Sequence, residues 1–411
     1  MGGRLLRQPW TDGNRFALLE NGENFFPRVF ERIAAAHKNI FLETFILFDD
    51  KVGQELNKHL REAAQRGVQV DITIDGWGSP DLSTEFIARM TEVGVRVHVF
   101  DPAPGILRRV HLFRRLHRKL IVIDAETAFI GGINFSADHL GDFGPEAKQD
   151  YSVEVHGPVV EHMYEFARAA VGRQQEKRTW FRRRKRSLSA PADAEGQATF
   201  VWRDNHDHRS DIERHYRLAI CLAQHRIVIA NAYFFPGYAF IRALRKAARR
   251  GVDVSLILQG NPDMPIVQYA ASMLYYHLLS GGVKIHEYCD RPLHGKVALV
   301  DDVWATIGSS NLDPLSLSLN LEANIVIRDH AFNAELGDSL ERLIRDSCRT
   351  IAIEDIKEPA WWRLARSFIV FHILRRYPSW AGWLPAHVPS LKPAEAMETE
   401  TTARQPKRKV S

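Results

Sequence analysis

The chain has 411 residues, 45% of them hydrophobic and 26% charged, and a formal net charge of +5. This composition excludes a disordered or fibrous chain, and the length predicts more than one packed unit. Three cysteines without a CxxC pair exclude a disulfide framework and favour a reducing compartment. No apolar run is long enough to cross a bilayer, and the N-terminus lacks the apolar core of a secretory signal.

Strand and helix patterns alternate along the first half of the chain and then recur. Residues 37–50 predict a strand, and the helix that follows ends at Gly67, which suits a left-handed cap. Residues 225–237 and a helix ending at Gly251 repeat this order, and an apolar strand follows each glycine. The alternation predicts an α/β fold with a mixed sheet in each half.

The chain is therefore expected to divide into two similar α/β halves and three accessory segments. Residues 173–186 hold eight basic residues and one acidic residue, and a stretch rich in Ser, Ala, Pro and Gly follows, which is typical of a linker. The last segment is rich in Pro, Glu, Thr and Lys and predicts disorder. The expected divisions are an N-terminal half (1–172), a basic flexible linker (173–198), a C-terminal half (199–352), an aromatic and basic segment (353–390) and a disordered tail (391–411).

One motif occurs in both halves at identical spacing. Residues 117–134 and 294–311 each read His-x-Lys-x4-Asp-x6-Gly-[Gly/Ser]-x-Asn. Two such matches in one chain are far too improbable for coincidence at average residue usage. If the halves pack about a pseudo-twofold axis, both copies face one site. The candidate catalytic residues are His117, Lys119 and Asp124 in the first copy and His294, Lys296 and Asp301 in the second.

Each copy supplies the groups that attack on a phosphodiester requires. His and Lys two positions apart on an extended strand point to the same side. The glycine-rich turn lets the backbone approach a phosphate closely, and Asn134, Asn311 and Ser309 are candidate phosphate ligands. With the two lysines, they would neutralise the non-bridging oxygens, where charge gathers in the transition state. We therefore expect no metal and no cofactor.

A mechanism with two imidazoles needs one neutral ring to attack phosphorus and one protonated ring to release the alkoxide. A carboxylate on the far ring nitrogen assists, and Asp150 and Glu322, which open apolar strands after the motifs, are the candidates. Asp124 and Asp301 are interpreted mainly as structural, bonding backbone or each other at the floor of the site, with a direct chemical role as the alternative. Histidines outside the motifs, His139 among them, show no paired ligand spacing and are interpreted as surface or packing residues.

The doubled HxKxxxxD…GxxN pattern resembles that of the phospholipase D superfamily, and further segments resemble bacterial cardiolipin synthases. These segments include LLENGENFFP, FGPEAKQDY and GSSNLDPLSLSLNLEA, and the likeness covers residues 10–390. The resemblance implies two α/β halves with one shared active site and ping-pong phosphatidyl transfer through a phosphohistidine. One phosphatidylglycerol would phosphatidylate the enzyme with loss of glycerol, and the hydroxyl of a second would complete cardiolipin.

In the superfamily that the chain resembles, the first motif carries the nucleophile. The resemblance therefore implies that His117 is the nucleophile and His294 the general acid and base, although the motifs alone do not decide which histidine has which role. One position departs from the superfamily pattern. Gly132 stands where a serine is common, so the two phosphate-binding turns need not contribute equally. A hydrolase or nuclease acting on lipid or nucleic-acid phosphodiesters is the alternative function, and the basic residues of the chain allow it.

Two segments predict contact with an anionic membrane surface. Residues 177–186 place Trp180 and Phe181 among basic residues, and residues 361–387 combine tryptophans with arginines around a short apolar run. A solvated linker and a buried terminal helix are the respective alternatives. Residues 104–119 alternate apolar and basic residues beside the first motif and are a candidate lipid entrance. We expect a peripheral protein on the cytoplasmic face of the bacterial membrane, with anionic phospholipid (phosphatidylglycerol) as its partner and no nucleic acid.

Overall fold

The computed structural model describes residues 8–100, 114–172, 195–260, 274–355 and 391–393. The strands of the first half are β1 (Thr11–Glu20), β2 (Asn39–Thr44), β3 (Gln69–Asp75), β4 (Arg96–Phe100), β5 (Leu120–Ile123), β6 (Thr127–Gly131) and β7 (Tyr151–His156). Its helices are α1 (Asn21–Ala34), α2 (Lys51–Gln65), α3 (Thr84–Thr91) and α4 (Val159–Gly172), with short 3-10 turns η2 (Ala137–His139) and η3 (Gly141–Phe143).

The second half repeats these elements. Its strands are β8 (Gly196–Arg203), β9 (Arg226–Asn231), β10 (Asp253–Gln259), β11 (Lys284–Tyr288), β12 (Lys296–Val300), β13 (Trp304–Gly308), β14 (Glu322–Arg328) and β15 (Cys348–Ile351), and β16 (Leu391–Pro393) comes last. Its helices are α5 (Asp211–Leu222), α6 (Tyr238–Arg249), α8 (Pro314–Ser318) and α9 (His330–Ser347), with the 3-10 turn η4 (Ile353–Asp355).

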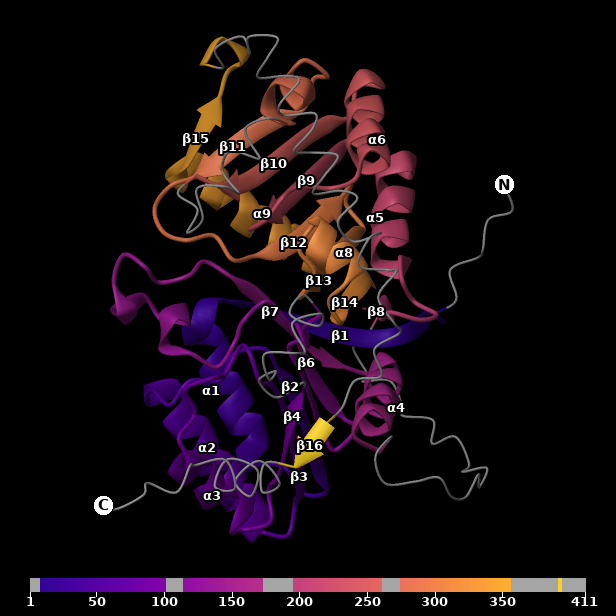
Figure 1. The fold of residues 1–411 in the computed structure, drawn as a ribbon. Helices are drawn as coiled ribbons and strands as arrows, with labels where there is room; N and C mark the ends of the chain where they lie inside the picture. Colours follow the sequence, from indigo (N-terminus) through magenta and orange to yellow (C-terminus); the bar gives the residue numbers. More distant parts are fainter. Residues whose placement is uncertain (1–7, 101–113, 173–194, 261–273, 356–390, 394–411) are drawn as a thin grey trace.

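Within the described residues the strands join in one mixed sheet that runs through both halves (Figure 1). β2, β3 and β4 are parallel neighbours, as are β9, β10 and β11, while β5–β7 and β12–β14 are antiparallel runs. β1 pairs with β7 of its own half and with β8 of the other half. The strand order is β15-β11-β10-β9-β12-β13-β14-β8-β1-β7-β6-β5-β2-β3-β4-β16. The predicted α/β class is confirmed, and the β1–β8 pair joins the two expected sheets into one.

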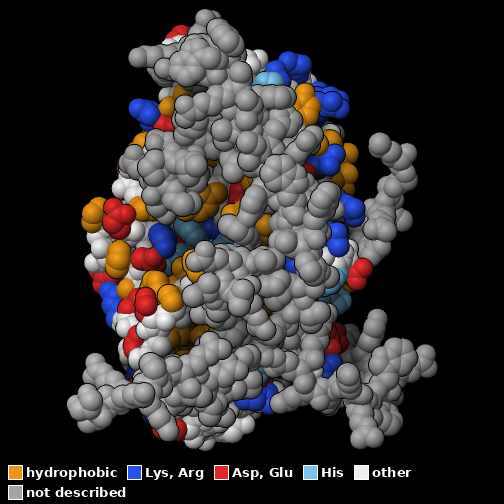
Figure 2. Space-filling model, in the orientation of Figure 1, with side chains coloured by type: hydrophobic (Ala, Val, Ile, Leu, Met, Phe, Trp, Pro, Cys, Tyr) orange, Lys and Arg blue, Asp and Glu red, His pale blue; other side chains and the backbone are white. Residues whose placement is uncertain are grey.

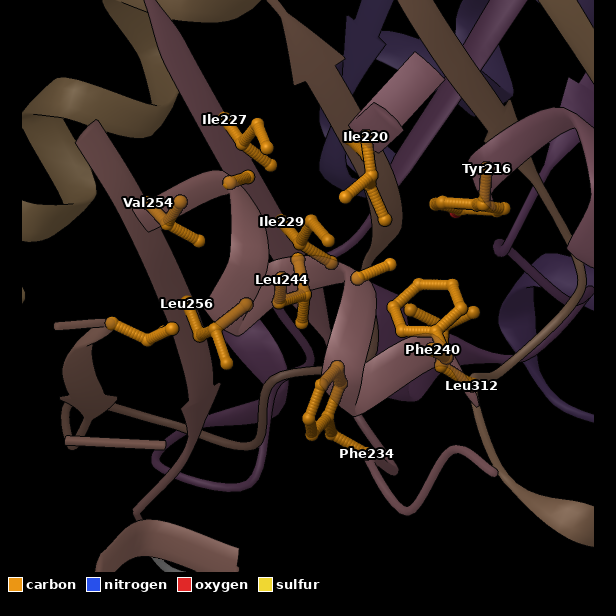
Figure 3. Packing of buried hydrophobic residues seen from close by; sticks show 14 of the residues in the cluster. Tyr216, Ile220, Ile227, Ile229, Phe234, Phe240, Leu244, Val254, Leu256 and Leu312 are labelled. Atoms are coloured by element: carbon orange, nitrogen blue, oxygen red, sulfur yellow. The ribbon is translucent and has the colours of Figure 1, made fainter. Parts of the chain in front are cut away.

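Three large clusters of buried apolar side chains hold the layers of the described residues together. One packs α1, α2 and α3 on first-half strands, and a second packs α5 and α6 on β9 and β10, where Phe240, Leu244 and Ile229 meet (Figure 3). The third takes side chains from β5–β7, β12–β14, α4 and α9. Because this central cluster draws on both halves, separating them would expose apolar surface to water, so the halves are held together at the site they share.

The helix ends predicted at Gly67 and Gly251 are confirmed. Both glycines follow the last helical turn with φ angles of 91° and 94°, in the left-handed region that favours glycine. The strands predicted over 37–50 and 225–237 are shorter than expected, since β2 and β9 end earlier. In each half the chain then leaves the ladder and forms an isolated bridge to the residue that follows the motif asparagine.

Much of what the sequence predicts for the membrane lies outside the described residues, namely 104–113 of the candidate entrance, 177–186 and 361–387. The first residues of the expected disordered tail differ from the prediction, because β16 pairs antiparallel with β4. β4 would otherwise be an edge strand with unpaired backbone groups, which explains the pairing. In the described part of the chain no helix has both the length and the apolar character that crossing a bilayer requires.

Candidate active site

The motif histidines and lysines lie at the N-terminal ends of β5 and β12. His117 and His294 come two residues before the lysines Lys119 and Lys296. The Lys119 Nζ donates a hydrogen bond to the His117 carbonyl at 2.8 Å, and the Lys296 Nζ donates to the His294 carbonyl. Each lysine therefore folds back beside its histidine, on the same side of the chain, as the alternation of an extended strand predicts.

Each motif histidine meets a carboxylate from the opposite half. The His117 Nδ1 lies 3.0 Å from the Glu322 Oε2, and the His294 Nδ1 lies 2.6 Å from the Asp150 Oδ2. The backbone follows the same crossing, because the His117 N–H donates to the Leu321 carbonyl at 3.0 Å and the His294 N–H donates to the Gln149 carbonyl at 2.8 Å. The sequence predicted both carboxylates, but it did not predict that they are exchanged between the halves.

Each glycine-rich turn lies against one of the two carboxylates. The Ser309 hydroxyl donates to the Glu322 Oε2, the same oxygen that meets His117. In the first half Gly132 takes this position, and a Cβ on it would lie 2.2 Å from the Asp150 Oδ1. Each turn thus contacts the carboxylate that holds the other motif's histidine. In Figure 2, histidine and basic side chains are visible in a recess between the two halves.

Ser309 differs from its predicted role. A hydroxyl has one proton, and this proton is given to the buried Glu322, while the Ala323 N–H donates to the Ser309 oxygen at 3.1 Å. The hydroxyl is therefore committed to orienting the carboxylate rather than to binding a phosphate. Asn134 and Asn311 keep the predicted placement at the turns, and both side chains are buried.

The two asparagines are held differently. The Asn134 Oδ1 accepts a hydrogen bond from the Ile46 N–H at 3.2 Å, which fixes the amide and leaves its NH2 group as a donor. In the described residues, the Asn311 Oδ1 has no hydrogen-bond partner, and neither has the buried Nδ2 of Asn231, which pairs with Lys296 in the β9–β12 ladder. Unpaired buried polar atoms are costly, so a polar ligand would satisfy them.

Asp124 and Asp301 are not brought to the imidazoles. Asp124 accepts hydrogen bonds from three backbone N–H groups at residues 37–39, and Asp301 accepts from those at residues 224–226. Both lie past the far end of a strand, roughly 20 Å along the chain from the histidines at the usual rise per residue. The predicted bonding to backbone is found, but the predicted position at the floor of the site is not.

The segments before the histidines are anchored by two residues that the sequence reading missed. The Asp75 Oδ2 accepts the Leu116 N–H at 2.9 Å, and the Gln259 Oε1 accepts the Leu293 N–H. These acceptors end β3 and β10, the equivalent strands of the two halves. A polar residue at the same place, the last position of each of two equivalent strands, was the available signal.

His139 lies next to the His294–Asp150 pair, a position that its interpretation as a surface or packing residue did not predict. Its ring is fully buried in η2 and lies 5.6 Å from the His294 ring, centroid to centroid. The His139 Nδ1 is 3.8 Å from the Asp150 Oδ2. Each of His139, Asp150 and His294 offers a potential metal-ligand atom within 4.8 Å of the others. His139 escaped notice because Ser316 stands at its place in the second half, so the repeat did not mark it.

Burial sets the charges in the site. It raises the pKa of Asp150 to about 7, and it lowers the pKa of Lys119 to about 7 and that of Lys296 to about 8. Burial alone would also raise the pKa of Glu322, but His117 and Lys119 hold it below its usual range. An anionic ligand between the lysines would restore their full charge, so the site favours a phosphate group.

The duplicated α/β fold and the paired motifs define a PLD-like protein. The family described as "Cardiolipin synthase, PLD-like domain" matches residues 29–168 and 216–344. The chain belongs to this family. It is 52% identical over 399 residues to cardiolipin synthase B of Salmonella typhi, covering 96% of this chain and 97% of that protein. It is 37% identical over 344 residues to cardiolipin synthase A of Pseudomonas aeruginosa, covering 82% of this chain and 68% of that protein.

Solved structures share the fold at low sequence identity. Phosphatidylserine synthase of Haemophilus influenzae superposes with a TM-score of 0.66 at 15% identity, covering 91% of this chain and 96% of that chain. Polyphosphate kinase of Porphyromonas gingivalis superposes with a TM-score of 0.56 at 15% identity, covering 87% of this chain and 53% of that chain. Both likenesses support the PLD-like arrangement of two α/β halves.

Proposed function

We propose that this enzyme transfers a phosphatidyl group between two phosphatidylglycerol molecules and releases cardiolipin and glycerol. The observation that carries the proposal is the exchange of carboxylates between the motif histidines, because an ionised and a protonated carboxyl would hold the two imidazoles in opposite tautomers, as the two roles require. The 52% identity to cardiolipin synthase B along nearly the whole chain supports the choice of reaction.

The two carboxylates give the two imidazoles opposite tasks. The ionised Glu322 accepts the Nδ1–H of His117, so the His117 Nε2 carries a lone pair and serves as the nucleophile. With a pKa near 7, Asp150 retains its proton below neutral pH. It then donates to the His294 Nδ1, so the His294 Nε2 carries the proton that the leaving group needs.

The first step forms the bond between the His117 Nε2 and phosphorus. The bond from phosphorus to the glycerol oxygen breaks, and the His294 Nε2 gives its proton to that oxygen while the Asp150 carboxyl passes its own proton to the His294 Nδ1, so glycerol leaves and the ring stays neutral. In the second step, the hydroxyl of another phosphatidylglycerol gives its proton to the His294 Nε2 and attacks phosphorus, while the His294 Nδ1 returns its proton to Asp150. The bond to His117 breaks, and cardiolipin forms with both imidazoles restored to their starting states.

The lysines and asparagines hold the phosphate through both steps. Lys119 and Lys296 lie beside the imidazoles, and their ammonium groups, together with the amides of Asn134 and Asn311, would bind the non-bridging oxygens. The charge on these oxygens grows in the transition state, so fixed donors in a buried site lower the barrier. These residues already supply cations and amide donors, and we derive no step through a metal or another cofactor.

Lipid would approach the open side of the site. The His117 and His294 side chains are 12% and 16% exposed, whereas their carboxylates are fully buried. The aromatic residues Trp77 and Phe143 are 55% and 51% exposed, and they follow Asp75 and His139 in the chain within four residues. Exposed aromatic side chains suit the headgroup region of a bilayer. We propose that the protein works at the surface of an anionic membrane, on its cytoplasmic face.

The test of the proposed function is lipid chromatography with the purified full-length enzyme. Vesicles or micelles of labelled phosphatidylglycerol should yield cardiolipin and free glycerol in equal amounts. Phosphatidic acid as the sole lipid product would contradict the proposal and favour a hydrolase. Cleavage of nucleic acid with no action on lipid would favour a nuclease.

A further inference from the structure

His139 sits where the two halves of the site differ. In the second half, the Ser309 hydroxyl supports the carboxylate that holds His117. In the first half Gly132 has no side chain, and a Cβ there would collide with both Asp150 oxygens, at 2.2 and 2.7 Å. The ring of His139 faces the same carboxylate instead, with its Nδ1 at 3.8 Å from the Asp150 Oδ2, beyond hydrogen-bond distance, and within the described residues this buried nitrogen has no hydrogen-bond partner.

The proton positions on His139 follow from its neighbours. The Asn134 backbone N–H donates to the His139 Nε2 at 3.2 Å, so this nitrogen must carry a lone pair. Burial lowers the pKa of His139 to about 3, so the ring is neutral. A neutral imidazole with its lone pair on Nε2 carries its hydrogen on Nδ1, the atom that faces Asp150.

This arrangement argues against a metal ion among His139, Asp150 and His294, although their ligand atoms lie within 4.8 Å of one another. A metal on the His139 Nδ1 would need the lone pair there, and the hydrogen would have to move to Nε2. It would then oppose the hydrogen of the Asn134 N–H. The hydrogen bond from the Asn134 N–H therefore leaves the His139 Nδ1 with a hydrogen and without a lone pair for a metal ion.

We propose that His139 is a positioning residue for the general acid: its Nε2 fixes the turn that carries Asn134, and its Nδ1–H, directed at the Asp150 carboxyl from 3.8 Å, favours electrostatically the placement of that carboxyl against the His294 Nδ1. The inference rests on the proposed roles of the two imidazoles. It explains why Gly132 is needed, because a serine there would push Asp150 away from both histidines. It also gives the two carboxylates different surroundings, a hydrogen-bonded hydroxyl on Glu322 and an imidazole at 3.8 Å from Asp150.

Two substitutions separate the two contacts of His139. In His139→Gln the amide oxygen can take the place of Nε2 and accept the Asn134 N–H, but no donor remains toward Asp150. In His139→Asn the amide nitrogen can take the place of Nδ1 and donate toward Asp150, but the acceptor is lost. Thermal unfolding of each variant shows whether it folds, and the readout is taken from whichever variants do.

The leaving group distinguishes a role in acid catalysis from a general structural role. Glycerol leaves as a strongly basic alkoxide and needs a proton, whereas para-nitrophenolate leaves without one. The full-length enzyme and its variants are compared on phosphatidylglycerol and on phosphatidyl-para-nitrophenol in the same mixed micelles. His139→Gln should lose roughly tenfold or more with the glycerol leaving group and less than about threefold with nitrophenol, whereas His139→Asn should keep the wild-type ratio.

Ser309→Ala provides the matched contrast, because it acts on the nucleophile's carboxylate and should slow both substrates equally. Equal losses on both substrates in His139→Gln would overturn the proposal. Inhibition of the wild-type enzyme by micromolar Zn²⁺, relieved in His139→Gln, would also overturn the proposal, because such binding would require a lone pair on the His139 Nδ1. The ratio is read from glycerol and nitrophenol release, so it tests the role of His139 even if wild-type enzyme forms phosphatidic acid and no cardiolipin.

Discussion

Asp150 and His294 lie 144 positions apart in the sequence and in opposite halves of the chain, yet their Oδ2 and Nδ1 atoms are 2.6 Å apart. His117 and Glu322 make the reciprocal contact at 3.0 Å. Neither motif histidine is therefore paired with a carboxylate of its own half. Duplication of the half has produced a site in which each motif depends on the other half for the charge state of its histidine.

The first prediction concerns these two carboxylates. Asp150→Asn and Glu322→Gln should each lower kcat by about 10² to 10⁴ with a small change in KM, because they act on proton transfer and nucleophilicity rather than on binding. Initial rates of cardiolipin formation over a range of phosphatidylglycerol concentrations provide the measurement. A rise in KM at unchanged kcat would show that the carboxylates serve only to bind lipid.

The second prediction is a bell-shaped dependence of kcat on pH. The nucleophile must be neutral, and burial lowers the pKa of His117 below its usual value, so the rate should rise with pH through the acid range. The acid pair must keep its proton, which Asp150 loses near pH 7, so the rate should fall above that point. At saturating lipid, the bound phosphate keeps the lysines charged, and the alkaline limb reports on Asp150.

The control for this profile is Asp150→Asn, whose amide does not titrate. Its residual kcat should lose the alkaline limb near neutral pH while keeping the acid limb that His117 produces. An alkaline limb that is unchanged in Asp150→Asn would assign it to another group and contradict the proposed pairing.

The third prediction separates structure from catalysis at the motif aspartates. Asp301 accepts the N–H groups of residues 224–226; burial would raise its pKa, but these bonds hold the pKa below its usual range. Asp301→Asn should therefore reduce the free energy of unfolding by about 1–3 kcal/mol and leave kcat/KM within about threefold. Urea unfolding and initial rates on the same preparation test both parts, and a large loss of kcat in a stably folded variant would count against the structural role.

The fourth prediction concerns stability in acid. His215 is buried against Trp10, and burial lowers its pKa to about 4, so it is neutral when folded and takes up a proton when the chain unfolds below its ordinary pKa. The unfolded state binds more protons there, so stability falls as pH decreases from 6.5 toward 4. When the pH falls from 7.5 to 5, the free energy of unfolding of His215→Phe should therefore rise by about 2 kcal/mol relative to that of the wild-type chain. An equal acid sensitivity of both proteins in urea unfolding would contradict it.

The sequence predicts the α/β class, the helix ends and the pair of motifs because each is recorded locally. Period-two apolar runs identify strands, a glycine in the left-handed region ends a helix, and repetition identifies the functional residues. Asp150 and Glu322 could be chosen because a carboxylate at the start of a buried strand needs a partner.

What the sequence does not predict depends on how distant segments meet. The crossing of the carboxylates follows from the backbone contacts of His117 with Leu321 and of His294 with Gln149, which no local pattern records. His139 has no histidine counterpart in the second half, so comparison of the two motifs does not identify it as a functional residue. Asp124 and Asp301 share the motif with the histidines, but the intervening strand carries them to its far end.

The most direct test of the shared site is to quench the enzyme during turnover of phosphatidylglycerol labelled at phosphorus and to map the acid-labile label. In His294→Ala, which lacks the general acid and base, label should accumulate on the peptide that contains His117, and His117→Ala should carry none. Label on the His294 peptide of His117→Ala, or no covalent label in any variant that still forms cardiolipin, would contradict the account.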